Sequence, residues 1–409
     1  MEPKQIIFIP TAHARSNSAN LLKRQDVIIG IYIPNGVMRE RAHELGVSYC
    51  VDALIFDRLA EAEVFESQAS VWGSTYYGYS EFLISASQND WTDALRTILN
   101  YILYPKKDRE SLANVQMELM LKLKKHIPSF WQRFWKALNP ENRYAIPVSG
   151  TVETVPKLNP QLLSDWKQQY YQVQNMCFCV TGEWKPAMQE ELASLIQAYE
   201  VATLTKLEHS PSTNEIPSLN DIILCGRYKQ VELVVAFLCR VGPEELLPGE
   251  ALCRRLEDIL DNQRYQDVTT RVEITIGEDS LFQIHCSVPA TIAFQALQTI
   301  GTAIAHWDQE MTAMDLTELQ TGLFKTYQDL FSNPEECNKF IGWNCTEGPW
   351  YDFNALQIKK TFHQKIQLDS MRMFKERVLR VENLVIYLHG APNEIEGKMW
   401  CQRFREMID

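Results

Sequence analysis

Few side chains in this sequence stand at a spacing that would let them perform chemistry together. His43 and Glu44 open like the zinc-binding pattern His-Glu-x-x-His, but Val47 occupies the closing position and offers no ligand atom. His285 and His389 lie in apolar, strand-like runs, a setting more typical of core histidines than of metal ligands. No histidine pair in the sequence therefore predicts a zinc site.

The ten cysteines are scattered along the chain without a Cys-x-x-Cys pair, so neither a zinc ribbon nor a redox motif is visible. Cys177 and Cys179 stand two apart in an apolar run, which on a strand places both side chains on one face. We expect buried free thiols there, because free cysteine behaves as a small hydrophobe.

The elements that must position any site occur in two similar series. Short motifs of the first half return in the same order in the second half, at a nearly constant offset, which indicates an internal duplication. The matching pairs are Phe82-x-Ile84-x-x-Ser87 with Phe282-x-Ile284-x-x-Ser287, Ala94-Leu95-x-Thr97-Ile98 with Ala296-Leu297-x-Thr299-Ile300, Val173-x-Asn175 and Gly182 with Val381-x-Asn383 and Gly390, and the strand-like runs 27–33 and 233–238.

Each half alternates strand-like runs with long helical segments. This order predicts an α+β fold of two homologous lobes, each a largely antiparallel sheet packed with helices. The linker composition of 209–218 separates a first lobe, 1–208, from a second lobe, 219–409. In the first half we expect strands at 27–33, 79–86 and 176–180 and helices at 91–104, 111–127 and 159–171.

Composition narrows the classes of function. A net charge of -12 argues against a nucleic-acid binder, which needs clustered lysine and arginine. The opening apolar run, 6–10, is too short for a secretory signal, and no run approaches transmembrane length. The basic segment 13–25 leaves a transit peptide open as an alternative, although the strand-like start favours a folded N-terminus. We expect a cytoplasmic protein that binds neither nucleic acid nor membrane.

The segment 46–56, GVSYCVDALIF, resembles part of the zinc motif of the M16 peptidase superfamily, which includes pitrilysin and the mitochondrial processing peptidase. In that family a string like Gly-x-Ala-His-x-Leu-Glu-His-Met-x-Phe carries His-x-x-Glu-His on a helix. The glycine, the apolar pattern and the phenylalanine align without gaps. Further matching stretches lie at 144–155, 158–163 and 171–176. The resemblance implies two tandem lobes of the LuxS/MPP-like metallohydrolase fold.

The chemical groups of that motif are missing. Histidines at i and i+4 share a helix face and bind one Zn²⁺, and the glutamate at i+3 deprotonates the zinc-bound water. Tyr49, Asp52 and Ala53 occupy these three positions, and Glu118 is the best match for the family's third ligand. Two carboxylates without either histidine do not make a zinc site. We therefore expect no metal, no cofactor and no catalytic residue in this chain.

Two further groups of residues are candidates for binding. Many relatives carry an arginine and a later tyrosine that grip the substrate peptide, and the resemblance places Tyr265 and, off register, Arg264 in these roles. A solvated, charged helix end is the alternative interpretation. The aromatic stripe of 130–135, with Trp131 and Trp135 at i, i+4 spacing, predicts core or inter-lobe packing, and a partner interface is the alternative.

In this superfamily the working chamber needs four lobes, and some members assemble it from an active and a degenerate chain. The resemblance therefore implies a pseudoenzyme, the non-catalytic subunit of a heterodimeric zinc peptidase. It would close the chamber and position a peptide for a partner that carries His-x-x-Glu-His and holds the zinc. Paired members occur in gene clusters that mature ribosomally made peptides such as bacteriocins, which suggests leader-peptide removal. A mitochondrial processing or respiratory core subunit is a less favoured version, and a stand-alone peptide-binding or scaffold homodimer is the alternative from another class.

Overall fold

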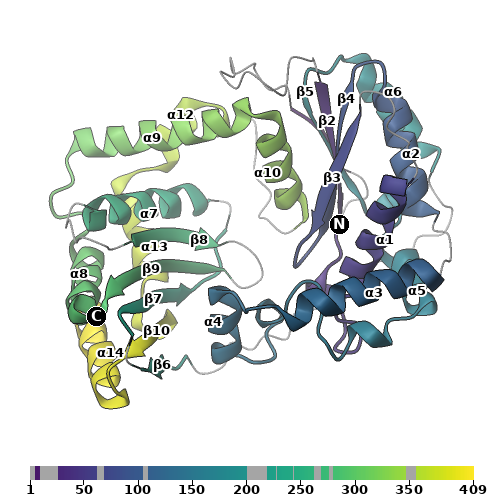
Figure 1. Ribbon diagram of the computed structural model, residues 1–409. Helices are drawn as coiled ribbons and strands as arrows, with labels where there is room; N and C mark the ends of the chain where they lie inside the picture. Colours follow the sequence, from purple (N-terminus) through teal and green to yellow (C-terminus); the bar gives the residue numbers. More distant parts are fainter. Residues whose placement is uncertain are drawn as a thin grey trace. The chain divides into compact units, whose positions relative to one another are not determined.

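The computed structural model of the chain describes residues 5–9, 26–61, 69–104, 109–199, 219–226, 228–242, 244–261, 269–275, 280–346 and 356–409. The chain divides into two compact units (Figure 1). The first unit comprises Met1–Lys136, Pro140–Thr213 and Asp329–Gly348, and the second comprises Ala137–Asn139, Asn214–Gln328 and Pro349–Asp409. Within the described ranges, no helix has the length and apolar character that crossing a membrane requires.

Each unit is built on a five-stranded sheet, and the two sheets share one topology. The strand orders are β1-β5-β2-β4-β3 and β6-β10-β7-β9-β8. In each sheet the first pair is parallel and the other pairs are antiparallel. The predicted α+β fold of two similar lobes on largely antiparallel sheets is therefore confirmed. The strands are β1 (Gln5–Phe8), β2 (Asp26–Ile33), β3 (Ser70–Thr75), β4 (Ser80–Ser87), β5 (Cys177–Gly182), β6 (Ile222–Cys225), β7 (Gln230–Leu238), β8 (Thr269–Thr275), β9 (Leu281–Pro289) and β10 (Leu384–Ala391).

The helices follow the same order in both halves of the chain, as the duplication predicts. A helix stands before the β3–β4 hairpin and before the β8–β9 hairpin, further helices follow each hairpin, and a last helix follows the final strand of each sheet. The first half contains α1 (Val47–Glu61), α2 (Trp91–Leu103), α3 (Arg109–Lys124), α4 (Phe130–Leu138), α5 (Pro160–Tyr170) and α6 (Ala187–Gln197). The second half contains α7 (Leu246–Asp261), α8 (Ala293–His306), α9 (Ala313–Ser332), α10 (Pro334–Thr346), α12 (Lys359–Lys365), α13 (Leu368–Val378) and α14 (Glu394–Ile408).

One face of the first sheet forms the main core of its unit. Because strand side chains alternate between faces, Val27, Ile29 and Ile31 of β2 point to the same side as Phe178 and Val180 of β5. These residues are buried in one apolar cluster with side chains from α1, α2, α3, α5 and α6. The sheet and the other four helices therefore hold α1, the helix that carries the degenerate motif, in a fixed orientation.

The opposite face of the first sheet is covered by α10, which comes from the second half of the sequence (Figure 1). Asn338 of α10 is fully buried there, and its amide donates to the carbonyl oxygens of Ile28 at 3.2 Å and Cys179 at 3.0 Å. Its Oδ1 accepts a 2.9 Å hydrogen bond from the Tyr32 hydroxyl. The sequence-based division assigned all of 219–409 to the second lobe. The structure instead groups 329–348 with the first unit, because these polar contacts lie on the first sheet.

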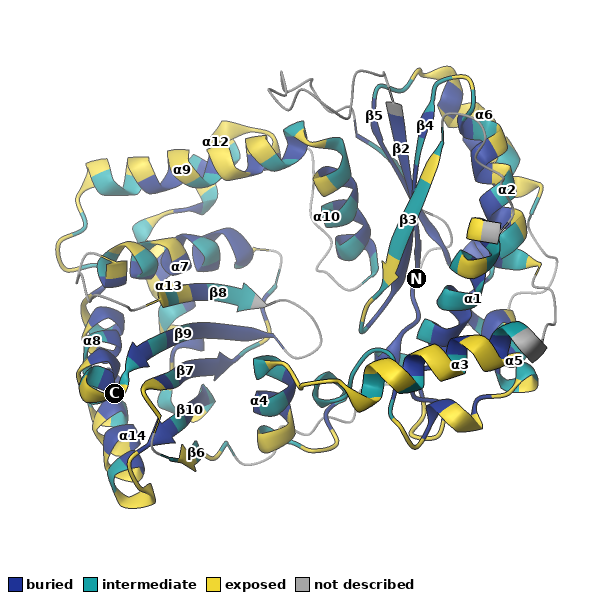
Figure 2. Cartoon of the chain, viewed as in Figure 1, coloured by how far each residue is buried: buried dark blue, intermediate teal, exposed yellow. Residues whose placement is uncertain are grey.

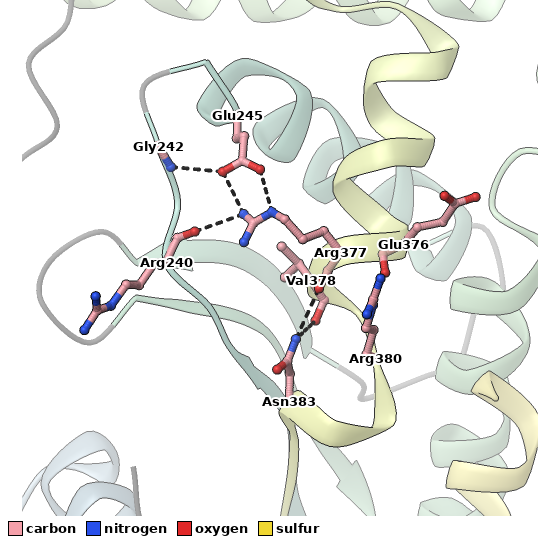
Figure 3. A network of polar contacts seen from close by, with 8 residues as sticks. All are labelled: Arg240, Gly242, Glu245, Glu376, Arg377, Val378, Arg380 and Asn383. Atoms are coloured by element: carbon pink, nitrogen blue, oxygen red, sulfur yellow. Dashed lines mark hydrogen bonds and ion pairs between the residues drawn. The ribbon is translucent and has the colours of Figure 1, made fainter. Parts of the chain in front are cut away.

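In the second unit, α13 is tied to the start of α7 by a bidentate ion pair (Figure 3). The Arg377 guanidinium donates to the Glu245 carboxylate at 2.6 and 2.7 Å and to the Arg240 carbonyl at 2.9 Å. Glu245 also accepts from the Gly242 amide at 3.1 Å. Paired N–H···O bonds of this kind fix geometry better than a single contact does. This network joins α13 to Arg240 and Gly242, which follow β7, and to Glu245, which precedes α7.

Candidate functional site

A pocket of about 300 Å³ in the first unit brings together the four positions that align with the zinc motif. Tyr49, Asp52 and Ala53 line it from α1, and Glu118 lines it from α3. The other lining residues are Phe56, Asp57, Gly73, Ser74, Thr75, Val115, Leu119 and Lys122. The convergence of Glu118 with the α1 residues, inferred from aligned sequence alone, is therefore present in the structure.

The N-terminus of α1 is fixed by a close backbone contact and a buried carboxylate. Gly46 has a φ of 93° and packs against Gly150, and a Cβ on Gly46 would lie 2.7 Å from the Ser149 carbonyl oxygen. Glycine is needed there because the left-handed conformation and the close approach both exclude a side chain. The Glu40 carboxylate accepts from the backbone amides of Gly46 at 2.7 Å and Ser48 at 2.9 Å, which satisfies two free donors of the helix end.

The Asp52 carboxylate is enclosed by hydroxyl groups. Tyr171 donates to its Oδ1 at 2.6 Å, Thr75 donates to its Oδ2 at 2.6 Å, and Ser80 donates to the same Oδ2. We call these three donors the hydroxyl cage. Asn35 supports the cage by donating to Tyr171 at 2.8 Å, and its Oδ1 lies 2.8 Å from the Ser80 Oγ, so it shares the single Ser80 hydroxyl proton with Asp52. The cage occupies both carboxylate oxygens, so Asp52 has a structural role in the folded unit.

Burial dominates the electrostatics of this carboxylate. Asp52 is 2% exposed. Loss of hydration raises the pKa of Asp52 to about 6, although the three hydroxyl hydrogen bonds and the charge of Lys167 act in the opposite direction. The same burial lowers the pKa of Lys167 to about 7. The Lys167 ammonium also lies 5.8 Å from the centre of the Tyr171 ring.

The other three pocket positions hold no group poised for chemistry. Glu118 Oε1 forms an ion pair with the Lys122 ammonium, at 2.7 Å, one helical turn further along α3. Much of α3 is exposed to solvent (Figure 2). Tyr49 and Ala53 are half-buried and pack against the apolar cluster under the sheet. The pocket is thus walled by an aromatic ring, a methyl group, a caged carboxylate and an ion pair.

The remaining predicted contacts divide into two cases. Arg264 and Tyr265, the substrate-binding candidates, lie outside the described residues. The aromatic stripe is α4, in which Phe134 and Trp135 are buried and the Trp135 ring lies 5.6 Å from that of Tyr144. Packing within the protein therefore accounts for these two rings, as expected.

The comparisons with known proteins match the chain to solved structures. The first half of the periplasmic protease PqqL from Escherichia coli superposes with a TM-score of 0.74 at 13% identity, covering 99% of this chain and 94% of that one. A peptidase M16 inactive domain from Pseudomonas fluorescens gives 0.72 at 15% identity, with coverage of 95% and 96%. A chain of Complex III2 from Candida albicans, bound to Inz-5, gives 0.71 at 11% identity, with coverage of 99% and 97%.

No protein-family profile matches the sequence, and no curated protein matches it. Structural likeness that covers nearly the whole of each chain, at TM-scores above 0.7, decides the architecture. The chain has the M16 peptidase fold. Against full-length PqqL, this chain is covered over 99% of its length and spans 49% of that protease.

The M16 fold implies zinc on the helix that corresponds to α1, and the residues present do not fit that ion. Ala53 offers no ligand atom, and tyrosine at position 49 is a poor ligand at neutral pH because the phenol pKa is about 10. The Asp52 carboxylate is held by its hydroxyl cage, and Glu118 is paired with Lys122. A catalytic zinc needs three protein ligands, usually with imidazole among them. We therefore derive no reaction step through zinc in this M16-fold chain.

Sequence reasoning missed the groups that surround the motif positions. Thr75, Ser80 and Tyr171 come from two strands and the end of α5, and no local pattern links them to Asp52. The ion pair of Glu118 with Lys122 could have been predicted from the sequence, because glutamate followed by lysine four residues later is a standard helical ion-pair spacing.

Proposed function

We propose that this chain is the non-catalytic subunit of a two-chain M16-type zinc peptidase. It encloses a peptide and orients it for a partner chain that carries intact His-x-x-Glu-His and the zinc. Positioning of this kind contributes to catalysis even when the positioning subunit performs no chemistry, because it converts an encounter into a fixed geometry.

One observation carries the proposal: the M16 fold is complete while its motif positions hold groups that cannot act on a peptide bond. The pocket retains Tyr49, Ala53 and Glu118 side by side, and Asp52 is turned into the hydroxyl cage. On the proposal, a subunit that binds the partner needs the fold but none of the zinc ligands.

The comparisons support this assignment in two ways. One similar structure is an inactive M16 domain, so the fold exists without activity in at least one other protein. The chain also corresponds to one half of PqqL, a protease whose single chain is about twice as long. On the proposal, a second polypeptide supplies the half that PqqL carries within one chain.

The proposed substrate class is a ribosomally made precursor peptide whose leader must be removed, and the proposed compartment is the cytoplasm. The resemblance to paired two-lobe members supplies the substrate class. A leader segment is long and extended, and enclosure by a non-catalytic subunit would raise its effective concentration at the partner's zinc.

The test is reconstitution with the product of the nearest gene that encodes His-x-x-Glu-His. Each chain alone and the mixture are assayed with Zn²⁺ on an unstructured peptide and on the precursor peptide of the same gene cluster. We expect cleavage by the mixture only, and a stable complex on size-exclusion chromatography.

The control is a partner whose motif glutamate is replaced by glutamine. The mixture should then lose activity while the complex still forms, which locates the chemistry in the partner. Equal cleavage by the partner alone would overturn the proposal. A homodimer of this chain that ignores the partner would favour the stand-alone peptide-binding or scaffold protein instead.

A further inference from the structure

Three buried thiols converge on the face of the first sheet that α10 covers. Cys177 and Cys179 point from β5 to this face, and Cys345 reaches it from the last turn of α10. Their three sulfur atoms lie within 4.8 Å of one another. The sequence predicted two buried thiols on one side of a strand. The structure adds a third thiol, Cys345, from α10, which lies far from β5 in the sequence.

The spacing of the sulfur atoms is that of a metal site. The Cys177 and Cys179 sulfurs are 3.9 Å apart. With a metal–sulfur bond of about 2.3 Å, two thiolates on one ion stand about 3.8 Å apart in tetrahedral geometry and about 4.0 Å apart in trigonal geometry. The third sulfur must move by less than about 1 Å to complete either arrangement. No backbone rearrangement is needed.

The surroundings select the kind of ion. In the described part of the chain, the group of candidate ligands at this place consists of the three cysteines, with no histidine or carboxylate among them. Structural zinc sites are almost always four-coordinate, whereas soft thiolates without oxygen or nitrogen ligands favour Cu(I). Cys179 is fully buried, and Cys177 and Cys345 are each 7% exposed, so an ion would reach the cluster from the side of these two.

We propose that Cys177, Cys179 and Cys345 form a binding site for a soft, thiophilic metal cation, with Cu(I) as the ion that suits its three-coordinate geometry. Binding exchanges the protons of the three thiols for the metal, so three protons leave to solvent and the cation offsets one of the three thiolate charges.

The bound ion would fasten α10 to the sheet. Asn338, near the other end of α10, already ties the helix to β2 and β5 through its amide. Gly342 lies between the two attachments, where its missing side chain lets the helix rest on the Tyr32 ring. A metal at Cys345 would therefore add a second fixed point and stabilise the first unit by mass action.

The test is Cu(I) titration of the reduced, metal-free chain under anaerobic conditions, with a chromophoric Cu(I) chelator as competitor. We expect one equivalent bound per chain, ultraviolet sulfur-to-copper charge-transfer absorption, and a higher melting temperature for the loaded protein. Cys345→Ala and Cys177→Ala should each weaken binding by more than about 100-fold, since even outer-shell changes at metal sites cost about 10–100-fold.

Cys337→Ala is the matched control. Cys337 lies on the same helix and is fully buried, but it is not one of the three clustered thiols, so its variant should bind Cu(I) like the unsubstituted chain. Equal loss in this variant, binding of Zn²⁺ with exclusion of Cu(I), or a disulfide between Cys345 and a strand thiol in freshly purified protein would each overturn the proposal. Because these readouts involve no partner and no peptide, they stand apart from the test of peptidase function.

Discussion

At the scale of single residues, Asp52, which the sequence resemblance aligns with a catalytic glutamate, is buried among hydroxyl groups. Both of its oxygens accept hydroxyl hydrogen bonds, and the donors come from Thr75, Ser80 and Tyr171. Three of the roughly four acceptor positions of this carboxylate are engaged, so it has little freedom to turn toward water in the pocket. The methylene lost relative to glutamate shortens its reach further.

The first prediction concerns the pH dependence of stability. Burial raises the pKa of Asp52 to about 6 in the folded protein, above the unfolded value of about 3.9. Its favourable contribution is therefore present below pH 4 and is lost as the pH rises through 6. Asp52→Asn cannot ionise. The stability of the unsubstituted chain relative to this variant should fall by roughly 2 kcal/mol between pH 4 and pH 6, measured by urea unfolding at each pH.

The control is Asp93→Asn, because the Asp93 side chain on α2 is 85% exposed. Its difference from the unsubstituted chain should stay flat over the same range. A flat difference for Asp52→Asn as well would mean that the pKa of Asp52 is not raised, because the hydroxyl hydrogen bonds then offset the loss of hydration.

A second prediction concerns the geometry of the pocket and tests whether these positions could hold a metal ion if they carried histidine. Tyr49 and Ala53 stand four residues apart on α1 with Glu118 in the same pocket. Tyr49→His combined with Ala53→His should create a Co²⁺ and Zn²⁺ site, because two imidazoles and a carboxylate form a competent ligand set. Cobalt absorption spectroscopy would detect it.

Adding Glu118→Ala to that variant should abolish or strongly weaken metal binding. Peptide hydrolysis should stay absent even with metal bound, since Asp52 remains in its hydroxyl cage. Metal binding that ignores Glu118 would show that α3 does not present its carboxylate to the α1 site.

At the scale of elements, many of the helices and strands could be predicted from the sequence. The strand expected at 27–33 is β2, Asp26–Ile33, and the helix expected at 91–104 is α2, Trp91–Leu103. These elements were predictable because alternation and helical periodicity report burial directly. The placement of α10 was not predictable, since a buried helical stripe shows that a helix packs but not which sheet receives it. The hydroxyl cage was hidden for the same reason.

The third prediction tests that placement. Asn338→Ala should lower the stability of the first unit by about 2–3 kcal/mol, because it removes a buried amide and leaves the Tyr32 hydroxyl without its acceptor. Lys339→Ala on the same helix should change stability by less than about 0.5 kcal/mol, since it removes only partly exposed ion pairs. Hydrogen exchange at β2 and β5 would localise the loss. Similar effects of the two substitutions would argue that α10 does not pack on this face.

At the scale of the whole molecule, the duplication extends to individual hydrogen bonds. Asn175 donates to the carbonyl of Gln169 at 3.3 Å, and its counterpart Asn383 donates to that of Arg377 at 3.3 Å. The glycines that close the following strands, Gly182 and Gly390, both have positive φ angles, 89° and 110°. Both units therefore keep the local geometry of the M16 fold, and the departure from the zinc motif lies at the pocket positions of the first unit.

The last prediction follows from the proposed partnership. If the partner supplies all of the chemistry, Glu118, which aligns with the third zinc ligand, should be dispensable in the active complex. Its carboxylate is 62% exposed and engaged by Lys122, and an exposed pair of this kind contributes only about 0.2–1 kcal/mol. Glu118→Gln in this chain should therefore leave kcat/KM of the complex within about twofold. Glutamine in place of the partner's motif glutamate should abolish cleavage. A loss of more than about tenfold from Glu118→Gln, about 1.4 kcal/mol, would mean that the Glu118 carboxylate holds the peptide or takes part in the reaction, and that the partner does not supply all of the chemistry.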